Sequence, residues 1–313
     1  MDPIVSGSTD TFHSTGASPR VRWTVPPGVI PPPHPKMPKA TARRGWKRVP
    51  DHIRKHMQPP MSKAGAEEAL AAGSLDPTQG RVIWNVAGRP VRQAVTRFEV
   101  PDGLRLEPAR RIGTRPDAPN RIGNYPVYRD GCALSLAVES RLEMTWLRWY
   151  DMQPDVDWMQ TQPFVLTWDV GDEGLHAFPD LLVRQGHRWV VVEVKPTRLM
   201  TPHAARKFRL AQQAFETTGV QHVHRPETSP QAEQNLRVIS CYKRVNPEYV
   251  SEMERLFAAR PAYFADAVRI LGDAGVAFEA VMTLVANGNC TLDLDEPFVA
   301  TSHLFWSEDV VRA

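Results

Sequence analysis

The chain has 313 residues, of which 42% are hydrophobic, and a net charge of +3, so it can hold one large domain or two modest ones. No apolar run approaches the roughly 18 residues of a membrane span, and the N-terminus is polar rather than signal-like. Its three cysteines are far apart and form no Cys-x-x-Cys pair, which disfavours a zinc site and a disulfide framework, so we expect a cytoplasmic protein without membrane contact.

The N-terminal segment differs in composition from the rest of the chain. Residues 1–63 carry eleven Lys and Arg against three Asp and Glu, a net charge near +8, which leaves the other 250 residues near −5. The segment is rich in proline and lacks apolar periodicity, so it cannot bury enough surface to order itself. We predict a disordered basic arm over residues 1–63, which either binds a polyanion such as DNA or is only a solvated tail.

Short strand and helix patterns follow the arm. In chain order they predict strands at 81–86 and 91–100, a basic connector at 110–129, a helix at 136–150, two or three strands within 157–195, a helix at 202–218 and a strand at 238–242. Alternation of strands and helices predicts an α/β domain over residues 64–246, with its core at about 125–246.

The last part of the chain changes character. Helical patterns at 247–259, 261–271 and 276–287 precede strand-like segments at 290–294 and 302–306, which predicts a winged-helix domain over residues 247–313. The third of these helices has no Lys or Arg and carries Glu279, so it is poorly equipped to approach DNA phosphates. We expect this domain to bind a protein partner rather than DNA.

The most informative stretch of the sequence lies between Ala177 and Pro196. Asp180 opens one short apolar run, and Glu193 and Lys195 close a second, valine-rich run that is typical of a buried strand. Because side chains alternate along a strand, Glu193 and Lys195 share one face. A hairpin turn around Gly186 would bring Asp180 and Glu193 to the same edge of a sheet.

These residue types suit metal-dependent phosphodiester hydrolysis. Mg²⁺ prefers oxygen ligands and usually binds one or two carboxylates together with phosphate and water. We therefore interpret Asp180 and Glu193 as Mg²⁺ ligands, with Mn²⁺ able to substitute, and Lys195 as the group that orients water or neutralises the developing charge. The competing interpretation is a surface ion pair between Lys195 and a neighbouring carboxylate.

A third acid lies on the preceding helix. Glu143 is the first candidate because we expect it inside the helix at the rim of the core, and Glu139 is the alternative one turn earlier. The sequence Ser140-Arg141-Leu142-Glu143 also fits a capping box, in which Glu143 would only fold back onto the backbone.

Three further sets of residues have a plain structural explanation beside a functional one. His222 and His224 are more typical of ordinary strand positions than of metal ligands. The basic side chains at 206, 207 and 209 either contact DNA phosphates or form a solvated helix face. Trp146 and Trp149 are most simply core residues.

The order of several motifs resembles the TnsA family, the endonuclease subunit of heteromeric transposases. The resemblance covers about residues 110–306. It rests on Tyr125-Pro126-Val127-Tyr128, Glu139 to Glu143, Asp155 to Pro163, Phe178-Pro179-Asp180, Val192 to Pro196, Asn235-Leu236 to Tyr242-Lys243-Arg244, and Ala286-Asn287-Gly288 to Leu292-Asp293-Leu294.

The resemblance implies a restriction-endonuclease-like core, a mixed central sheet flanked by helices, with Glu143, Asp180 and Glu193 at the metal site and Lys195 as the catalytic lysine. It implies cleavage of the 5′ strands at transposon ends in a bacterial cytoplasm. The implied partners are transposon-end DNA, a DDE-type (TnsB-like) transposase and an AAA+ (TnsC-like) ATPase. A stand-alone restriction or repair nuclease and a non-catalytic DNA-binding or scaffold subunit are the alternatives.

Overall fold

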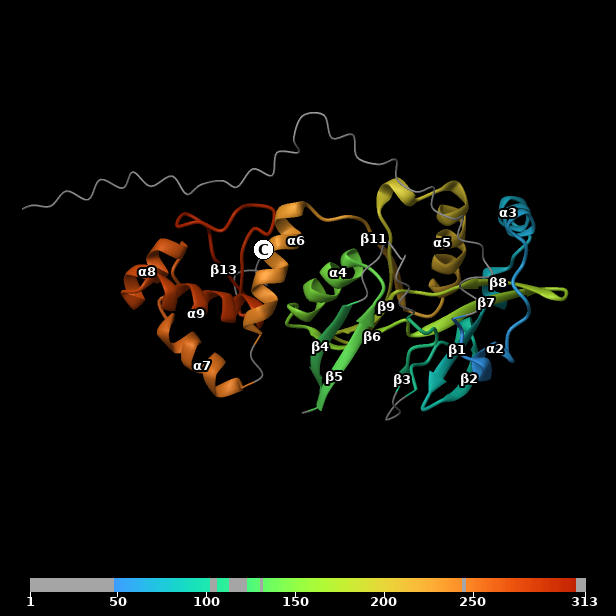
Figure 1. Cartoon of the computed structure of the whole chain (residues 1–313), viewed down its shortest axis with the longest axis horizontal. Coiled ribbons are helices and arrows are strands. Elements are labelled where there is room, and N and C mark those ends of the chain that lie inside the picture. Colours follow the sequence, from blue (N-terminus) through green and yellow to red (C-terminus); the bar gives the residue numbers. More distant parts are fainter. Residues whose placement is uncertain (1–47, 102–105, 113–122, 130–131, 244–245, 308–313) are drawn as a thin grey trace, which may run out of the picture. The chain divides into compact units, whose positions relative to one another are not determined.

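A computed structural model describes residues 48–101, 106–112, 123–129, 132–243 and 246–307, all within the larger of the chain's two units, residues 41–313. The described part is a mixed α/β structure with several sheets, as predicted at that level (Figure 1). None of its helices has both the length and the apolar character needed to cross a bilayer.

The structure has these elements. The helices are α2 (Asp51–Arg54), α3 (Lys63–Ala72), α4 (Arg141–Asp151), α5 (Pro202–Phe215), α6 (Pro230–Ile239), α7 (Pro247–Leu256), α8 (Phe264–Leu271) and α9 (Ala274–Ala286). The strands are β1 (Arg81–Val86), β2 (Arg89–Ala94), β3 (Leu106–Glu107), β4 (Gly123–Arg129), β5 (Cys132–Val138), β6 (Val156–Thr161), β7 (Phe164–Val170), β8 (Glu173–Ala177), β9 (Leu181–Gln185), β10 (Arg188–Val194), β11 (Gln221–Arg225), β12 (Cys290–Thr291) and β13 (Phe305–Trp306).

A four-stranded mixed sheet occupies the centre of the predicted core. Its strand order is β11-β10-β9-β6, with β10 and β11 parallel and the other neighbours antiparallel. The predicted β9–β10 hairpin is confirmed, and Gly186 takes a positive φ of 58° in its turn. The parallel β10–β11 pair needs a crossover connection, and α5 supplies it.

Both faces of this sheet are covered. Val190 and Val192 pack in one apolar cluster with Leu147 of α4, while Val191 belongs to another cluster with Phe215 of α5. Alternation along β10 therefore divides its side chains between two helical layers, as expected for a strand buried on both sides. This arrangement confirms the face assigned to Val190 and Val192 and turns Glu193 toward the α5 side.

A second sheet extends the structure on the N-terminal side. Its order is β2-β1-β7-β8, and β3 also pairs with β1. After β6 of the central sheet, the chain runs through β7 and β8 of this second sheet and then returns to β9. In sequence, β7 and β8 therefore lie between two strands of the central sheet. Trp84 of β1 packs edge-on against Phe164 of β7, with ring centroids 4.8 Å apart.

Residues 48–63 belong to this folded part. Val49, Ile53 and Met57 are buried in a cluster with Ile83 and Val165, and the following helix α3 begins at Lys63. The predicted arm of residues 1–63 is therefore wrong in its boundary, because scattered apolar side chains without periodicity still found a surface to cover. Its first 47 residues lie outside the described part of the chain.

Several predicted elements differ from the structure, and three of them differ in the type of secondary structure. The helix expected at 136–150 begins only at Arg141, because residues 132–138 form strand β5. The basic connector expected at 110–129 ends in strand β4, which pairs antiparallel with β5. The strand expected at 238–242 is instead the end of α6 and a short 3₁₀ turn, because Ser229 caps a helix that runs through the β-branched residues.

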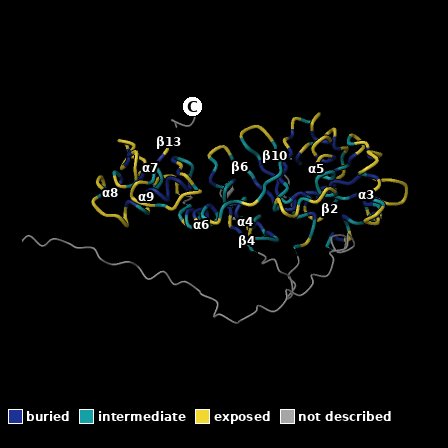
Figure 2. Tube along the Cα trace, turned by 90° about the horizontal axis from the view of Figure 1, so that it is seen from above, coloured by how far each residue is buried: buried dark blue, intermediate teal, exposed yellow. Residues whose placement is uncertain are grey.

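The C-terminal helices form a separate apolar cluster with β12 and β13. The helices predicted in this part are all present, and a tight turn at Gly272 (φ 74°) joins α8 to α9. Most of α9 is buried, including Val281, Leu284 and Val285, whereas in α8 only Ala267 is buried and the other residues are half-buried or exposed (Figure 2). Burial of α9 explains its apolar composition.

Candidate functional site

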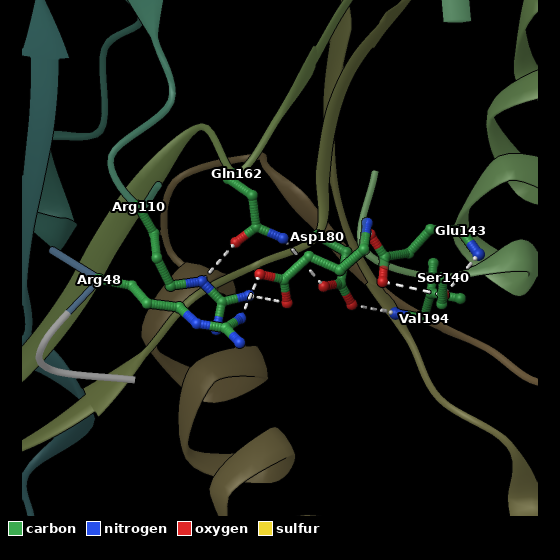
Figure 3. A network of polar contacts seen from close by, with 8 residues as sticks. Arg48, Arg110, Ser140, Glu143, Gln162, Asp180 and Val194 are labelled. Carbon is green, nitrogen blue, oxygen red and sulfur yellow. Dashed lines mark hydrogen bonds and ion pairs between the residues drawn. The ribbon is translucent and has the colours of Figure 1, made fainter. Parts of the chain in front are cut away.

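Asp180 lies at the edge of the central sheet, one residue before β9. Its backbone N–H donates to the carbonyl oxygen of Val192 over 3.0 Å, so Asp180 is fixed beside the end of β10. Its carboxylate accepts hydrogen bonds from the Gln162 amide on Oδ1 (3.3 Å) and from the Val194 backbone N–H on Oδ2 (2.8 Å) (Figure 3). Asp180 is thus oriented by Gln162, which directly follows β6, and by the backbone of β10.

Glu193 lies at the end of β10, where the sheet brings it to the edge occupied by Asp180. Burial and the Asp180 charge raise the pKa of Glu193 to about 8, against the attraction of Lys207 and Lys195. Among the described residues, none donates a hydrogen bond to this carboxylate. Glu193 therefore has free oxygen atoms beside a second carboxylate.

Glu143 occupies the first turn of α4, three residues after the N-cap Ser140. Its carboxylate accepts hydrogen bonds from the Glu139 backbone N–H (2.8 Å) and the Ser140 hydroxyl (2.9 Å), and its own N–H donates to Ser140 Oγ (3.1 Å) (Figure 3). The capping interaction that the sequence left open is present. The expectation that Glu143 lies deeper inside the helix is wrong.

Glu143 nevertheless belongs to the same electrostatic cluster. Its side chain is only 7% exposed, and burial together with the Asp180 charge raises its pKa to about 8. Burial likewise raises the pKa of Asp180 to about 6, although the Val194 N–H and Arg110 oppose the shift. Both Glu143 and Glu193 therefore interact with Asp180, whose charge makes ionisation of each glutamate less favourable.

The three carboxylates do not meet at one point. The described residues contain no group of three His, Cys, Asp or Glu side chains arranged to hold a metal ion. Glu143 comes from the α4 side of the sheet and Glu193 faces the α5 side, and Glu143 is held by its own helix end. A divalent ion held by Asp180 and Glu193, completed by phosphate and water, fits the oxygen donors present.

Two lysines supply positive charge on the α5 side. Lys195 follows β10, and its backbone N–H donates to the Arg225 carbonyl oxygen of β11 (3.0 Å). Lys207 of α5 interacts with Glu193, and burial lowers its pKa against the attraction of that carboxylate. The sequence grouped Lys207 with exposed basic residues, but its helical position turns it inward while Arg209, two residues on, is exposed.

Glu139, the alternative to Glu143, has a different environment. Arg48 donates to its Oε1 and Arg110 to its Oε2, each over 2.8 Å (Figure 3). Both oxygen atoms are therefore paired with guanidinium groups. Glu139 therefore forms two ion pairs, whereas the hydrogen bonds to Glu143 come from its own helix end.

The other candidates have structural roles. The His222 ring stacks on Phe208 with centroids 4.6 Å apart, and burial lowers its pKa to about 3. The Arg225 guanidinium lies 5.0 Å from the Trp146 ring and 5.3 Å from the Trp149 ring, so the two tryptophans are half-buried around a cation rather than fully in the core. His222 is a core residue, as its strand position suggested.

Sequence reasoning missed Arg48, Arg110 and the role of Gln162. Gln162 was noted only within a Gln-Pro motif, and Arg110 only as part of a basic connector. One signal was available for Gln162, since a glutamine between apolar strand segments requires a polar partner when it is buried. The arginines gave no such signal, because their partners are distant in sequence.

Comparison with models of known protein families and with curated proteins found no match for this chain. The resemblance to the TnsA family therefore remains a hypothesis that rests on the motifs and on the arrangement of the residues they contain.

Proposed function

We propose that the protein is a Mg²⁺-dependent DNA endonuclease, and that Mn²⁺ can replace Mg²⁺. The observation that carries this proposal is the pair of carboxylates at strand ends, Asp180 and Glu193, in which the Asp180 charge makes ionisation of Glu193 less favourable beside Lys195 and Lys207. Burying like charges together costs free energy unless a cation compensates them. A divalent ion with a bound phosphate would provide that compensation.

The residues divide the chemistry between them. Asp180 and Glu193 would hold the ion, which when bound lowers the pKa of water and polarises the phosphate. Lys195 would orient the attacking water or neutralise charge on the phosphate. Lys207 is a second cation for the same charge, and Glu143 is a further acidic group on the opposite side of Asp180.

The fold is compatible with a restriction-endonuclease-like core. The order α4-β6-β9-β10-α5-β11 forms a mixed sheet with a helix on each face, and β7 and β8 are an excursion within it. We further propose that α7, α8 and α9 with β12 and β13 are a winged-helix domain. The burial of α9 disfavours a groove-reading role for this helix, and we propose that the domain binds a protein partner.

The biological role proposed here follows the resemblance. The protein would be the bacterial TnsA-like subunit that cuts the 5′ strands at transposon ends, together with a DDE-type transposase and an AAA+ ATPase. The ion pairs, hydrogen bonds and charges around Asp180 support an active nuclease over a non-catalytic scaffold, because a scaffold has no use for buried carboxylates that repel each other.

Cleavage of a radiolabelled transposon-end duplex tests the proposal. The full chain is incubated with Mg²⁺ or with EDTA, with and without a partner DDE-type transposase. The strand that is cut, and whether the cut lies at the 5′ or the 3′ end of the transposon, are then mapped. Metal-dependent 5′-strand cleavage that needs the transposase supports the whole proposal. Cleavage without the transposase would indicate a stand-alone nuclease, and no cleavage under any condition would contradict nuclease function.

A further inference from the structure

A continuous network of hydrogen bonds leads from the N-terminal segment to Asp180 (Figure 3). Arg48 and Arg110 each bind one oxygen of Glu139. Arg110 Nε donates to Gln162 Oε1 over 3.1 Å, and Gln162 Nε2 donates to Asp180 Oδ1 over 3.3 Å. The described segments that contribute to this network are far apart in sequence, and the fold brings them together at the sheet edge.

Arg110 determines which way the Gln162 amide faces. A guanidinium has donors only, so the oxygen of the amide must face Arg110. The amide nitrogen then faces Asp180, where it can only donate. An amide without this arginine could rotate by 180° and present its oxygen to the carboxylate, which would repel it.

The backbone of Gln162 is also specialised. Its φ of 47° is uncommon for a residue with a side chain, and its side chain is only 1% exposed. Its N–H donates to the Asp180 carbonyl oxygen (2.9 Å), while its carbonyl oxygen accepts from the Ala109 N–H (2.8 Å). Gln162 thus connects the loop that carries Arg110 to the residue whose carboxylate it binds.

Arg110 is held from two further directions. Its guanidinium lies over the Phe178 ring, 5.2 Å from the ring centroid, and Phe178 is two residues before Asp180. Arg48 adds a backbone contact, because its carbonyl oxygen accepts from the Arg111 N–H over 2.8 Å. The N-terminal segment that carries Arg48 is therefore connected to the support of the site.

We propose that Gln162 and Arg110 are positioning residues that orient the Asp180 carboxylate toward a divalent cation, and that Glu139 and Arg48 hold Arg110 in place. This inference rests on the proposed function. With one hydrogen bond on each oxygen, Asp180 keeps a free acceptor direction on Oδ1 and on Oδ2. The network selects which directions remain free, and outer contacts of this kind tune metal affinity.

Binding of Mn²⁺ to the full chain tests the inference without relying on catalysis. Electron paramagnetic resonance measures free Mn²⁺, and hence the dissociation constant, for wild type, Gln162→Met and Gln160→Met. Gln160 is a matched control, since it is buried two residues earlier, in β6, but donates only to the Thr161 carbonyl oxygen. We expect Gln162→Met to weaken Mn²⁺ binding about 10- to 100-fold and Gln160→Met to change it little.

Arg110 variants separate orientation from charge. Arg110→Lys keeps the positive charge but loses the planar group that pairs with Gln162 and Glu139 together. We expect Arg110→Lys to weaken Mn²⁺ binding as much as Arg110→Met does. Restoration of wild-type affinity by lysine would overturn the positioning role and leave only a charge effect. These variants also serve if Gln162→Met fails to fold.

The two proposals fail in different ways. Wild type that binds Mn²⁺ through Asp180, as shown by loss of binding in Asp180→Asn, combined with unchanged affinity in Gln162→Met and Arg110→Lys, would overturn this inference alone. Wild type with no Asp180-dependent Mn²⁺ binding would overturn the proposed metal site and this inference with it.

Discussion

The central sheet and the C-terminal helices bury very different groups. Around Asp180 the structure encloses carboxylates whose charges oppose one another, together with Lys207. Around α9 the buried side chains are almost all aliphatic or aromatic, with Thr283 as a neutral exception. The C-terminal region shows that this chain can build a core without enclosing charge, so the charges near Asp180 are explained better by chemistry than by folding.

The ionisation of Asp180 should matter most for activity. We expect Asp180→Asn to lower the rate of DNA cleavage at least ~10³-fold. The metal stabilises charge in the transition state by several kcal/mol, and each 1.4 kcal/mol lost lowers the rate about tenfold. Asp157→Asn is the control, because Asp157 pairs with Arg184 at an exposed position. Cleavage by Asp180→Asn at a rate near that of Asp157→Asn would contradict the proposed role of Asp180 in cleavage.

The C-terminal core should show the opposite behaviour. Leu284 of α9 is fully buried, and Leu284→Ala should lower the free energy of unfolding by about 3 kcal/mol through lost burial and a cavity. Urea denaturation measures this loss. The cleavage rate per folded molecule should stay within about twofold of the wild-type rate, because a tenfold change in rate would need a change of about 1.4 kcal/mol in the activation barrier. A much larger fall would mean that this core supports the active site directly.

Variants of Glu143 and Ser140 separate a role in cleavage from helix capping at the N-terminal end of α4. Glu143→Gln keeps an acceptor for the capping interactions but removes the ionisable group beside Asp180, and we expect a roughly 10- to 100-fold lower cleavage rate. Ser140→Ala removes the cap and should cost about 1 kcal/mol of stability with less effect on cleavage. Equal loss of activity in both variants would show that Glu143 acts only through the helix end.

The pH dependence of stability sharpens the same contrast. The pKa of Glu193 is about 8 in the folded protein, above its value of 4.5 when exposed, so its contribution to stability is present below pH 4.5 and is lost as the pH rises to about 8. Glu193→Gln does not titrate and should gain stability relative to wild type over this range. Urea unfolding in EDTA at several pH values measures the difference, and Mg²⁺ should reduce it.

A pH-independent difference between Glu193→Gln and wild type would contradict the raised pKa. Val191→Ala serves as a control, because it removes a buried apolar group from the same face of β10 without a titrating group. Its loss of stability should not depend on the pH over the range in which Glu193 titrates.

The smallest effect is expected from the N-terminal residues. Deletion of residues 1–47, which carry seven Lys and Arg against two Asp, should weaken DNA binding and flatten its dependence on salt, because fewer counterions are released. Filter binding at several salt concentrations measures both quantities. An unchanged salt slope would indicate that the segment contacts a protein rather than DNA.

The sequence predicted what depends on neighbouring residues. The β9–β10 hairpin, the shared face of Val190 and Val192, and the proximity of Asp180 and Glu193 all follow from alternation and from a two-strand turn. The capping box at Ser140 was likewise visible in four consecutive residues. The helices of the C-terminal part were recognisable because apolar periodicity and Gly272 mark them locally.

Local signals failed where tertiary packing decided the outcome. The β-branched residues Val238 and Ile239 favour a strand by propensity, yet they continue a helix because Leu236 and Ile239 are buried against the C-terminal core. Residues 48–63 lack periodicity but are fixed by apolar contacts with β1 and β7. Propensity is a weak prior that burial can override.

The candidate site likewise combines features that the sequence determined with features that only tertiary packing decided. The sequence by itself determined the chemical types present, namely the carboxylates, Lys195 and the strand that carries Glu193. Only the tertiary structure decided that Lys207 faces Glu193, that Glu139 is paired with Arg48 and Arg110, and that Gln162 binds Asp180. These contacts join residues up to 91 positions apart, and such pairings depend on packing at a shared sheet edge, which no local pattern encodes.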